Sequence, residues 1–214
     1  MRITFLGTGA AISPGRLWAS LLVDDAILID PSPTAPWAMK KAGADPSRLR
    51  AVLVTHAHAD HAFGLPLLVA ELRFRHGRDV PVVGPRGFAR WTRALMRLAY
   101  ADARLPVRVV ERPRLRLGPY RVEAVALRHT VRAQGYRVTR GGRTLAYSGD
   151  TEPCPGLGRL VAGADLAVVE TTSRRRLPGH LTPEDARSLG GRVVATHIGD
   201  ADLEGANDFE TRRV

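Results

Sequence analysis

Cysteine is nearly absent from this 214-residue chain, which has Cys154 as its one thiol. A lone thiol cannot form an internal disulfide, and it excludes a zinc site built from several cysteines. No apolar run approaches the roughly 18 consecutive residues of a membrane span. The apolar stretch within residues 1–7 is too short for a secretion signal. We therefore expect a cytoplasmic protein with no membrane partner.

Lysine is also scarce, because Lys40 and Lys41 leave 30 of the 32 basic residues as arginine. With 21 acidic residues the net charge is +11. Arginine suits bidentate recognition of phosphate, although a solvated basic surface is the simpler interpretation. Apolar residues are 44% of the chain and charged residues 25%, which is ordinary for a globular protein. The length predicts one folded domain over residues 1–214.

Short apolar runs typical of strands alternate with helical patterns along the chain. Asp24-Asp25 and Gly141-Gly142 each separate two such runs and indicate hairpins. Thr182 followed by Pro183 predicts a helix start. The polar tail 198–214 is expected to be loosely held. Predicted strands are 2–6, 20–23, 26–30, 49–54, 81–83, 107–110, 114–117, 121–127, 135–139, 143–147, 166–169 and 192–196, and predicted helices are 35–43, 65–75, 86–99, 156–162 and the segment from 182.

The predicted helix 86–99 is amphipathic and rich in arginine. An arginine stripe opposite an apolar stripe is typical of a solvated helix face. The alternative is a surface that binds a polyanion. The apolar positions, spaced by 3, 4 and 3, are Phe88, Trp91, Leu95 and Leu98, and the arginines, spaced by 4, 3 and 4, are Arg86, Arg90, Arg93 and Arg97.

Histidine is concentrated at one point of the sequence. Three of the seven histidines, with an aspartate, lie in Thr55-His56-Ala57-His58-Ala59-Asp60-His61, directly after the predicted buried strand 49–54. Imidazole and carboxylate groups suit zinc and similar divalent metals. The cluster therefore predicts a metal site at the end of this strand.

Three further candidate ligands also follow predicted strands. His129 follows strand 121–127, Asp150 follows strand 143–147, and His197 follows strand 192–196. Strand ends place such side chains on a rigid frame at one sheet edge. One ion cannot readily accept every member of the crowded cluster, whereas two ions 3.5–4 Å apart could share it. A carboxylate such as Asp150 is then a natural bridge between them.

Taken together, these motifs resemble those of the metallo-β-lactamase-fold hydrolases, and within them the ribonuclease Z-like branch. The resemblance covers nearly the whole chain. The motifs that carry it are Phe5-Leu6-Gly7-Thr8-Gly9, Thr55-His56-Ala57-His58-Ala59-Asp60-His61-Ala62-Phe63-Gly64-Leu65-Pro66, Ser148-Gly149-Asp150-Thr151, Glu170-Thr171-Thr172 and Gly179-His180-Leu181-Thr182.

The resemblance implies an α/β fold: a four-layer αβ/βα sandwich of two mixed β-sheets flanked by helices. It implies that one zinc ion is held by His56, His58 and His129, and the other by Asp60, His61 and His197. Asp150 and a hydroxide nucleophile would bridge the two ions. The catalytic residues implied are His180 as general acid, Glu170 as its orienting carboxylate, and Asp60.

One departure from the family pattern concerns the substrate. Ribonuclease Z proper has a long arm that grips transfer RNA, inserted between the motifs that match His129 and Asp150. Here these residues are 21 positions apart, which leaves no room for an arm, so transfer RNA is not the expected substrate. We expect a dinuclear zinc phosphodiesterase acting on a small phosphodiester or a nucleic-acid end.

Several alternatives stay open at this stage. The same fold could hydrolyse a carboxylic ester or lactone, or the chain could be a non-catalytic, basic nucleic-acid-binding protein. Arg174, Arg175 and Arg176 precede His180 and are either a phosphate clamp or a solvated loop. Manganese or iron could replace zinc. Ribonuclease Z-like relatives suggest a homodimer.

Overall fold

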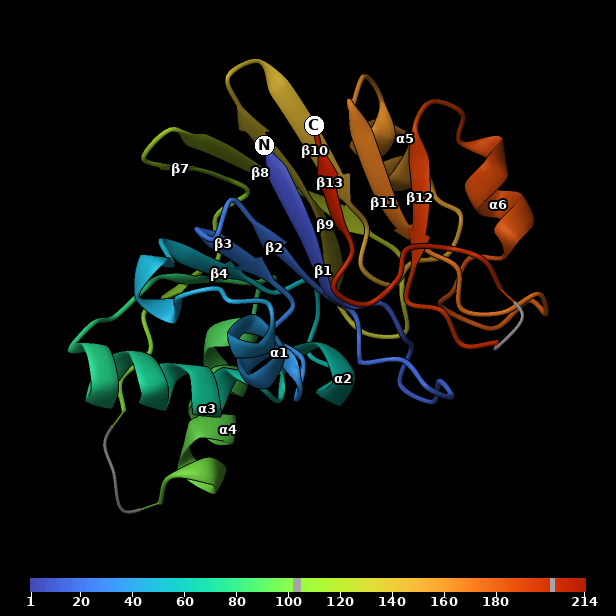
Figure 1. Cartoon of the computed structure of the whole chain (residues 1–214). Coiled ribbons are helices and arrows are strands. Elements are labelled where there is room, and N and C mark those ends of the chain that lie inside the picture. Colours follow the sequence, from blue (N-terminus) through green and yellow to red (C-terminus); the bar gives the residue numbers. More distant parts are fainter. Residues whose placement is uncertain (102–104, 201–202) are drawn as a thin grey trace.

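Two β-sheets packed face to face form the centre of the molecule, and helices cover both outer faces (Figure 1). The computed structural model describes residues 1–101, 105–200 and 203–214. This four-layer arrangement confirms the αβ/βα sandwich of two mixed sheets. Within the described ranges, no helix is both long and apolar enough to cross a bilayer.

The first sheet contains the N-terminal strands together with the last strand of the chain. Across the described residues it has seven strands, in the order β13-β1-β2-β3-β4-β5-β6. The pairs from β13 to β3 are antiparallel, and those from β3 to β6 are parallel. The strands are β1 Arg2–Gly7, β2 Ser20–Val23, β3 Ile27–Ile29, β4 Ala51–Leu53, β5 Val82–Val83, β6 Val109–Val110 and β13 Thr211–Arg213.

The second sheet contains the strands of the C-terminal half. In the described part of the chain it has six strands, in the order β12-β11-β10-β9-β8-β7. Its pairs from β12 to β10 are parallel, and those from β10 to β7 are antiparallel. The strands are β7 Arg114–Leu117, β8 Tyr120–Leu127, β9 Ala133–Arg140, β10 Arg143–Tyr147, β11 Leu166–Glu170 and β12 Val193–Thr196.

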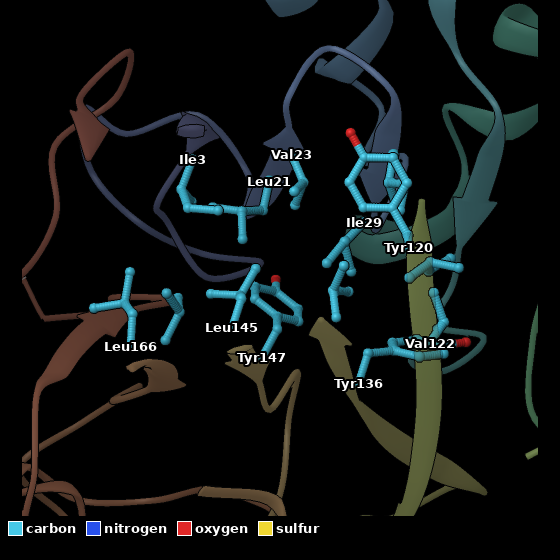
Figure 2. Close-up of a cluster of buried hydrophobic side chains, with 14 of the residues drawn as sticks. Ile3, Leu21, Val23, Ile29, Tyr120, Val122, Tyr136, Leu145, Tyr147 and Leu166 are labelled. Carbon is cyan, nitrogen blue, oxygen red and sulfur yellow. The ribbon is translucent and has the colours of Figure 1, made fainter. Parts of the chain in front are cut away.

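The main core lies between the sheets (Figure 2). Ile3 and Leu21 of the first sheet pack in one cluster with Tyr136, Leu145 and Tyr147 of the second, all at most 1% exposed. A second core of similar size joins the first sheet to its helices, and a smaller one joins the second sheet to its helices. The helices are α1 Ala35–Lys41, α2 Ala59–Ala62, α3 Leu65–Ala70 and α4 Phe88–Ala99 beside the first sheet, and α5 Pro155–Val161 and α6 Pro183–Ser188 beside the second.

The turn and cap predictions hold. Asp24 and Asp25 both have positive φ (50° and 56°) in the three-residue loop that joins the paired residues Val23 of β2 and Ile27 of β3. Gly141 and Gly142 likewise have positive φ in the hairpin turn between β9 and β10. Thr182 accepts a hydrogen bond from the Asp185 amide, while the Asp185 carboxylate bonds back to the Thr182 amide, which completes a capping box.

The prediction for the tail was wrong for residues 198–200 and 203–214, while residues 201–202 lie outside the described residues. Strand β13 pairs with β1, so that the two chain ends lie side by side (Figure 1). Ile198 and Ala206 are fully buried, and Asp208 accepts hydrogen bonds from the Thr8 hydroxyl and the Leu17 amide. Polar composition hid this role because β13 is an edge strand whose pairing depends on backbone hydrogen bonds.

The faces of the helix within 86–99 also differ from the prediction. Helix α4 starts at Phe88, and its buried residues are Phe88, Thr92 and Met96, so Phe88 alone of the expected stripe is buried while Trp91 and Leu95 are half-buried. Leu98 is 85% exposed. The helix is therefore rotated relative to its apolar pattern, because a threonine and a methionine fill the positions that face the sheet. The predicted helix 65–75 is α3 followed by a π-helical turn, η2 Glu71–Arg75.

Candidate metal centre

The seven predicted ligands converge at one edge of the two sheets. Each lies shortly after a strand: His56 and His58 in the loop after β4, with Asp60 and His61 in the short helix α2 that follows it, His129 after β8, Asp150 after β10 and His197 after β12. The donor atoms within each set lie within 4.8 Å of one another. The sets are His56, His58, His129 and Asp150; Asp60, His61 and His197; and Asp150, His180 and His197.

Three imidazoles of the first set point their nitrogens at one another. His56 Nε2 lies 3.1 Å from His58 Nδ1, and His129 Nε2 lies 3.2 Å from the same atom. Zinc–nitrogen bonds of 2.0–2.1 Å at a tetrahedral angle place two nitrogens roughly 3.3 Å apart. The spacing of these three nitrogens therefore fits a tetrahedral metal ion.

The second set has unpartnered polar atoms in its interior. Asp60 Oδ2 lies 3.2 Å from His197 Nε2 and 3.4 Å from His61 Nε2. His61 Nε2 and Asp150 Oδ1 are buried, and within the described residues neither has a hydrogen-bond partner. Buried polar atoms rarely lack partners, so these two are suited to a shared cation.

Asp150 lies between the two sets. Its Oδ2 atom is 3.8 Å from His56 Nε2 and 3.9 Å from His129 Nε2, both in the first set. Its Oδ1 atom is 3.3 Å from His61 Nε2 and 3.4 Å from His197 Nδ1, in the second. One oxygen therefore faces each set, as a bridging carboxylate requires.

The protonation states of the donors suit metal binding. Burial lowers the pKa of His56 well below its ordinary value, and burial likewise lowers the pKa values of His58 and His129. Burial alone would raise the pKa of Asp150, but the nearby His197 and His61 hold it well below the usual range. Neutral imidazole is the form in which histidine binds divalent metals, so these three rings are in the required state. Burial alone would lower the pKa of His61, but Asp150 and Asp30 raise it well above its ordinary value, so this ring must release a proton when a metal binds.

His180 lies beside the two sets and is held through one ring nitrogen. Its Nδ1 atom is 3.0 Å from Glu170 Oε1 and 3.1 Å from the Thr172 hydroxyl. The fully buried Glu170 carboxylate also accepts hydrogen bonds from backbone amides of Thr151 and Leu181. Burial alone would lower the pKa of His180, but the hydrogen bond and charge of Glu170 raise it above the ordinary value. The imidazole is thus oriented and its protonated form stabilised.

Thr172 connects His180 to the metal centre. Its hydroxyl lies 2.8 Å from Glu170 Oε2, 3.1 Å from His180 Nδ1 and 2.9 Å from His197 Nδ1. Thr172 belongs to a motif recognised in the sequence, but the residue pattern alone assigned it no role. Its position couples the orientation of His180 to that of a candidate ligand.

The sequence analysis missed Asp30. This fully buried carboxylate accepts hydrogen bonds from the Thr55 amide (2.8 Å) and hydroxyl (2.9 Å), and lies 2.9 Å from His61 Nδ1. It therefore fixes both the start of the histidine loop and the ring of one candidate ligand. The signal was present, because Asp30 follows the apolar strand Ile27–Ile29 in the same way that the other candidates follow theirs.

His129 is oriented by a backbone group instead. Its Nδ1 atom donates a hydrogen bond of 2.7 Å to the carbonyl oxygen of Gly179, the residue before His180. Gly179 has φ +84°, and a Cβ there would lie 2.6 Å from this same nitrogen. Only glycine therefore allows the contact.

A cavity of about 310 Å³ opens above the centre. His58, Asp60, Asp150, His180 and His197 contribute its polar wall. Its apolar residues include Ala10, Ala11, Ile12 and Leu177. Arg174, Arg175 and Arg176 are absent from the residues that line it, and Arg176 forms a two-pronged ion pair with Asp185. The expected phosphate clamp thus lies outside this cavity.

A family model described as a β-lactamase superfamily domain matches residues 25–198. The chain belongs to the metallo-β-lactamase superfamily. A ribonuclease Z of Pyrobaculum arsenaticum is 30% identical, over 92% of this chain and 86% of that protein. The human short-form tRNase Z structure superposes with a TM-score of 0.83 at 24% identity, covering 100% and 99% of the two chains. A diphosphatase of the PhnP family gives a TM-score of 0.77 at 21% identity, covering 100% and 97%.

These comparisons confirm a ribonuclease Z-like hydrolase of the metallo-β-lactamase superfamily, with a centre suited to divalent metals. The alignment with the Pyrobaculum arsenaticum protein spans 249 positions, whereas 92% of 214 residues is about 197. About 52 positions of this alignment therefore have no counterpart in the 214-residue chain. Between His129 and Asp150 it has only the hairpin of β9 and β10.

Proposed function

We propose that this chain is a dinuclear metal-dependent phosphodiesterase that cleaves a small phosphodiester or an accessible nucleic-acid end. The observation that carries the proposal is the pair of adjoining donor sets joined by Asp150. His56, His58 and His129 would hold one ion, Asp60, His61 and His197 the other, and Asp150 both. Zinc suits this nitrogen-rich donor set. When bound, two such ions supply a water nucleophile near neutral pH and stabilise charge on the phosphoryl oxygens.

The chain's own contribution to the chemistry is a positioned proton. Nδ1 of His180 is engaged by Glu170 and Thr172, which leaves Nε2 for the substrate. His180 lines the cavity, so a phosphodiester above Asp150 would place its leaving oxygen within reach of Nε2. The raised pKa of His180 favours the protonated form that a general acid needs. Asp60 would bind the second ion together with His61 and His197, and its carboxylate faces the same cavity.

The shape of the site supports a small substrate or the end of a nucleic-acid strand. The cavity is open to solvent and has the volume of a small-ligand pocket. A hairpin occupies the interval where an arm for transfer RNA would be inserted. We therefore propose that this chain does not hold the body of a transfer RNA, since it has a hairpin in place of the arm that would bind it.

Metal removal tests the proposal directly. Purified protein should contain close to two equivalents of divalent metal and should hydrolyse bis(p-nitrophenyl) phosphate. Chelation should abolish this hydrolysis and zinc should restore it; manganese and iron are tested beside zinc. Hydrolysis of a lactone or of p-nitrophenyl acetate, with no cleavage of phosphodiesters, would contradict the proposal and favour the carboxylic ester alternative.

Replacing His180 separates proton transfer from metal binding. We expect His180→Ala to lower kcat for bis(p-nitrophenyl) phosphate by about 10²–10⁴-fold, the usual contribution of general acid catalysis. The metal content should stay unchanged, because the two main donor sets do not need this ring. Metal analysis and steady-state kinetics check both. His76→Ala is the control, since His76 lies in the turn after η2, and loss of zinc in His180→Ala would instead make His180 a ligand.

A further inference from the structure

A second and larger cavity lies against helix α4. Its volume is about 1000 Å³, and its walls come from α4, from η2 and from the chain that leads into β6. No residue lines both this cavity and the one above the metal centre. Trp91 on another part of α4 packs against Phe88 and Phe63 instead. We call this space the α4 cavity.

Arginine dominates the polar wall of the α4 cavity. Arg93, Arg97 and Arg108 line it, and within the described residues their side chains have no ion pair or hydrogen bond. Arg73 also lines it but is paired with Asp79 at 2.8 Å. The residues found in the wall include no acidic side chain. Three guanidinium groups thus line one concave space, and none of them forms an ion pair within the described residues. The acidic group whose charge acts on Arg93 is Glu111, and its carboxylate is held by the backbone amides of Gly87 and Ala89.

The floor of the α4 cavity is apolar, with one unused hydroxyl. Met96, Leu105 and Val107 contribute apolar surface, and Tyr100 adds an aromatic ring. Thr92 is 1% exposed, and its hydroxyl has no hydrogen-bond partner in the part of the chain that the structure describes. A helical threonine ordinarily bonds back to a carbonyl of the preceding turn. The hydroxyl therefore keeps its hydrogen-bonding capacity at the base of the cavity.

The rotation of α4 explains why Arg93 and Arg97 line the α4 cavity and do not lie on an open, solvated face of the helix. Because Thr92 and Met96 are the buried positions, Arg93 and Arg97 stand directly beside them, at the edge of the cavity. Arg86 and Arg90 belong to the same sequence stripe but are absent from the cavity wall. The stripe thus divides into two arginines at a concave site and two on open surface.

We propose that the α4 cavity binds a nucleotide unit, with its phosphate on Arg93, Arg97 and Arg108 and its base on the apolar floor. Guanidinium groups match phosphate oxygens in bidentate geometry. A large apolar pocket with a few convergent polar groups is the usual form of a small-ligand site. The unit is either a free nucleotide or one residue of a bound strand. This site does not depend on the hydrolytic function proposed above.

Matched double variants test the α4 cavity. Isothermal titration of the full chain uses AMP, adenosine and a 5′-phosphorylated tetranucleotide as probes. We expect AMP or the tetranucleotide to bind and adenosine to bind at least about tenfold more weakly, because adenosine lacks the phosphate that forms charge-assisted hydrogen bonds with the arginines. Arg93→Gln with Arg97→Gln should weaken binding at least about tenfold. Arg86→Gln with Arg90→Gln removes the same charge from the open surface and should change affinity less than about threefold.

The titrations distinguish a free nucleotide from a nucleic-acid strand as the ligand, and a specific site from non-specific charge attraction. Binding of AMP alone identifies a free nucleotide, whereas binding of the tetranucleotide alone identifies a strand. No binding of either probe, or an equal loss in both double variants, would overturn the site in favour of non-specific charge attraction. Both double variants should hydrolyse bis(p-nitrophenyl) phosphate as the wild type does, so failure here and failure of the proposed hydrolysis are distinguishable.

Discussion

Asp150→Ala should abolish hydrolysis, lowering the turnover of bis(p-nitrophenyl) phosphate by at least about a thousandfold. The expectation rests on geometry, because Asp150 faces His56 and His129 with one oxygen and His61 and His197 with the other. Loss of this carboxylate removes the one side chain common to both donor sets and the negative charge between them. A metal centre contributes several kcal/mol to catalysis, and each 1.36 kcal/mol is a factor of ten in rate.

The same variant should lose metal. Metal content after dialysis should fall from two equivalents to one or fewer, because among the described residues no other carboxylate faces both sets. Asp165→Ala serves as control, since that carboxylate pairs with Arg143 and lies outside the centre. The control should retain its metal and turnover. If Asp150→Ala kept two equivalents of zinc, Asp150 could not be the bridging ligand.

Much of the centre could be predicted because its ligands obey a local rule. Each candidate follows a strand, and the histidines are few enough for their concentration to be visible. Strand ends at one sheet edge converge whatever the intervening loops do. The sequence therefore located residues as far apart as His56 and His197 in one site, while the distances between them came only from the structure.

Other features depend on contacts that local patterns do not contain. The faces of α4 are set by the sheet beneath it, which accepts Thr92 and Met96 in place of larger apolar residues. Strand β13 is held by backbone pairing with β1, and the paired residues are at least 207 positions apart in sequence, as for Thr4 and Thr211. Thr172 acts through three partners from different loops. Tertiary packing determines the faces of α4, the pairing of β13 and the role of Thr172, so the periodicity and composition of the sequence could not predict them.

Asp30→Ala should reduce the free energy of unfolding of the metal-free protein by about 3–5 kcal/mol, the usual cost of removing one partner from a buried charged pair. The carboxylate is fully buried and serves the Thr55 amide, the Thr55 hydroxyl and His61 Nδ1. Alanine leaves all three groups without an acceptor in a site closed to water. Metal affinity should also fall by about 10–100-fold, because His61 loses the group that orients it.

Asp25→Ala is the matched control for this prediction. Asp25 and Asp30 both have a left-handed backbone (φ 56° and 53°), so replacement by alanine perturbs the two backbones alike. Asp25, however, forms its ion pair with the partly exposed Arg2 at the surface, where such pairs contribute about 0–1 kcal/mol. Urea unfolding in the presence of chelator measures both variants without the contribution of bound metal. A loss in Asp30→Ala no greater than in Asp25→Ala would show that backbone strain, and not the buried hydrogen bonds, determines the effect.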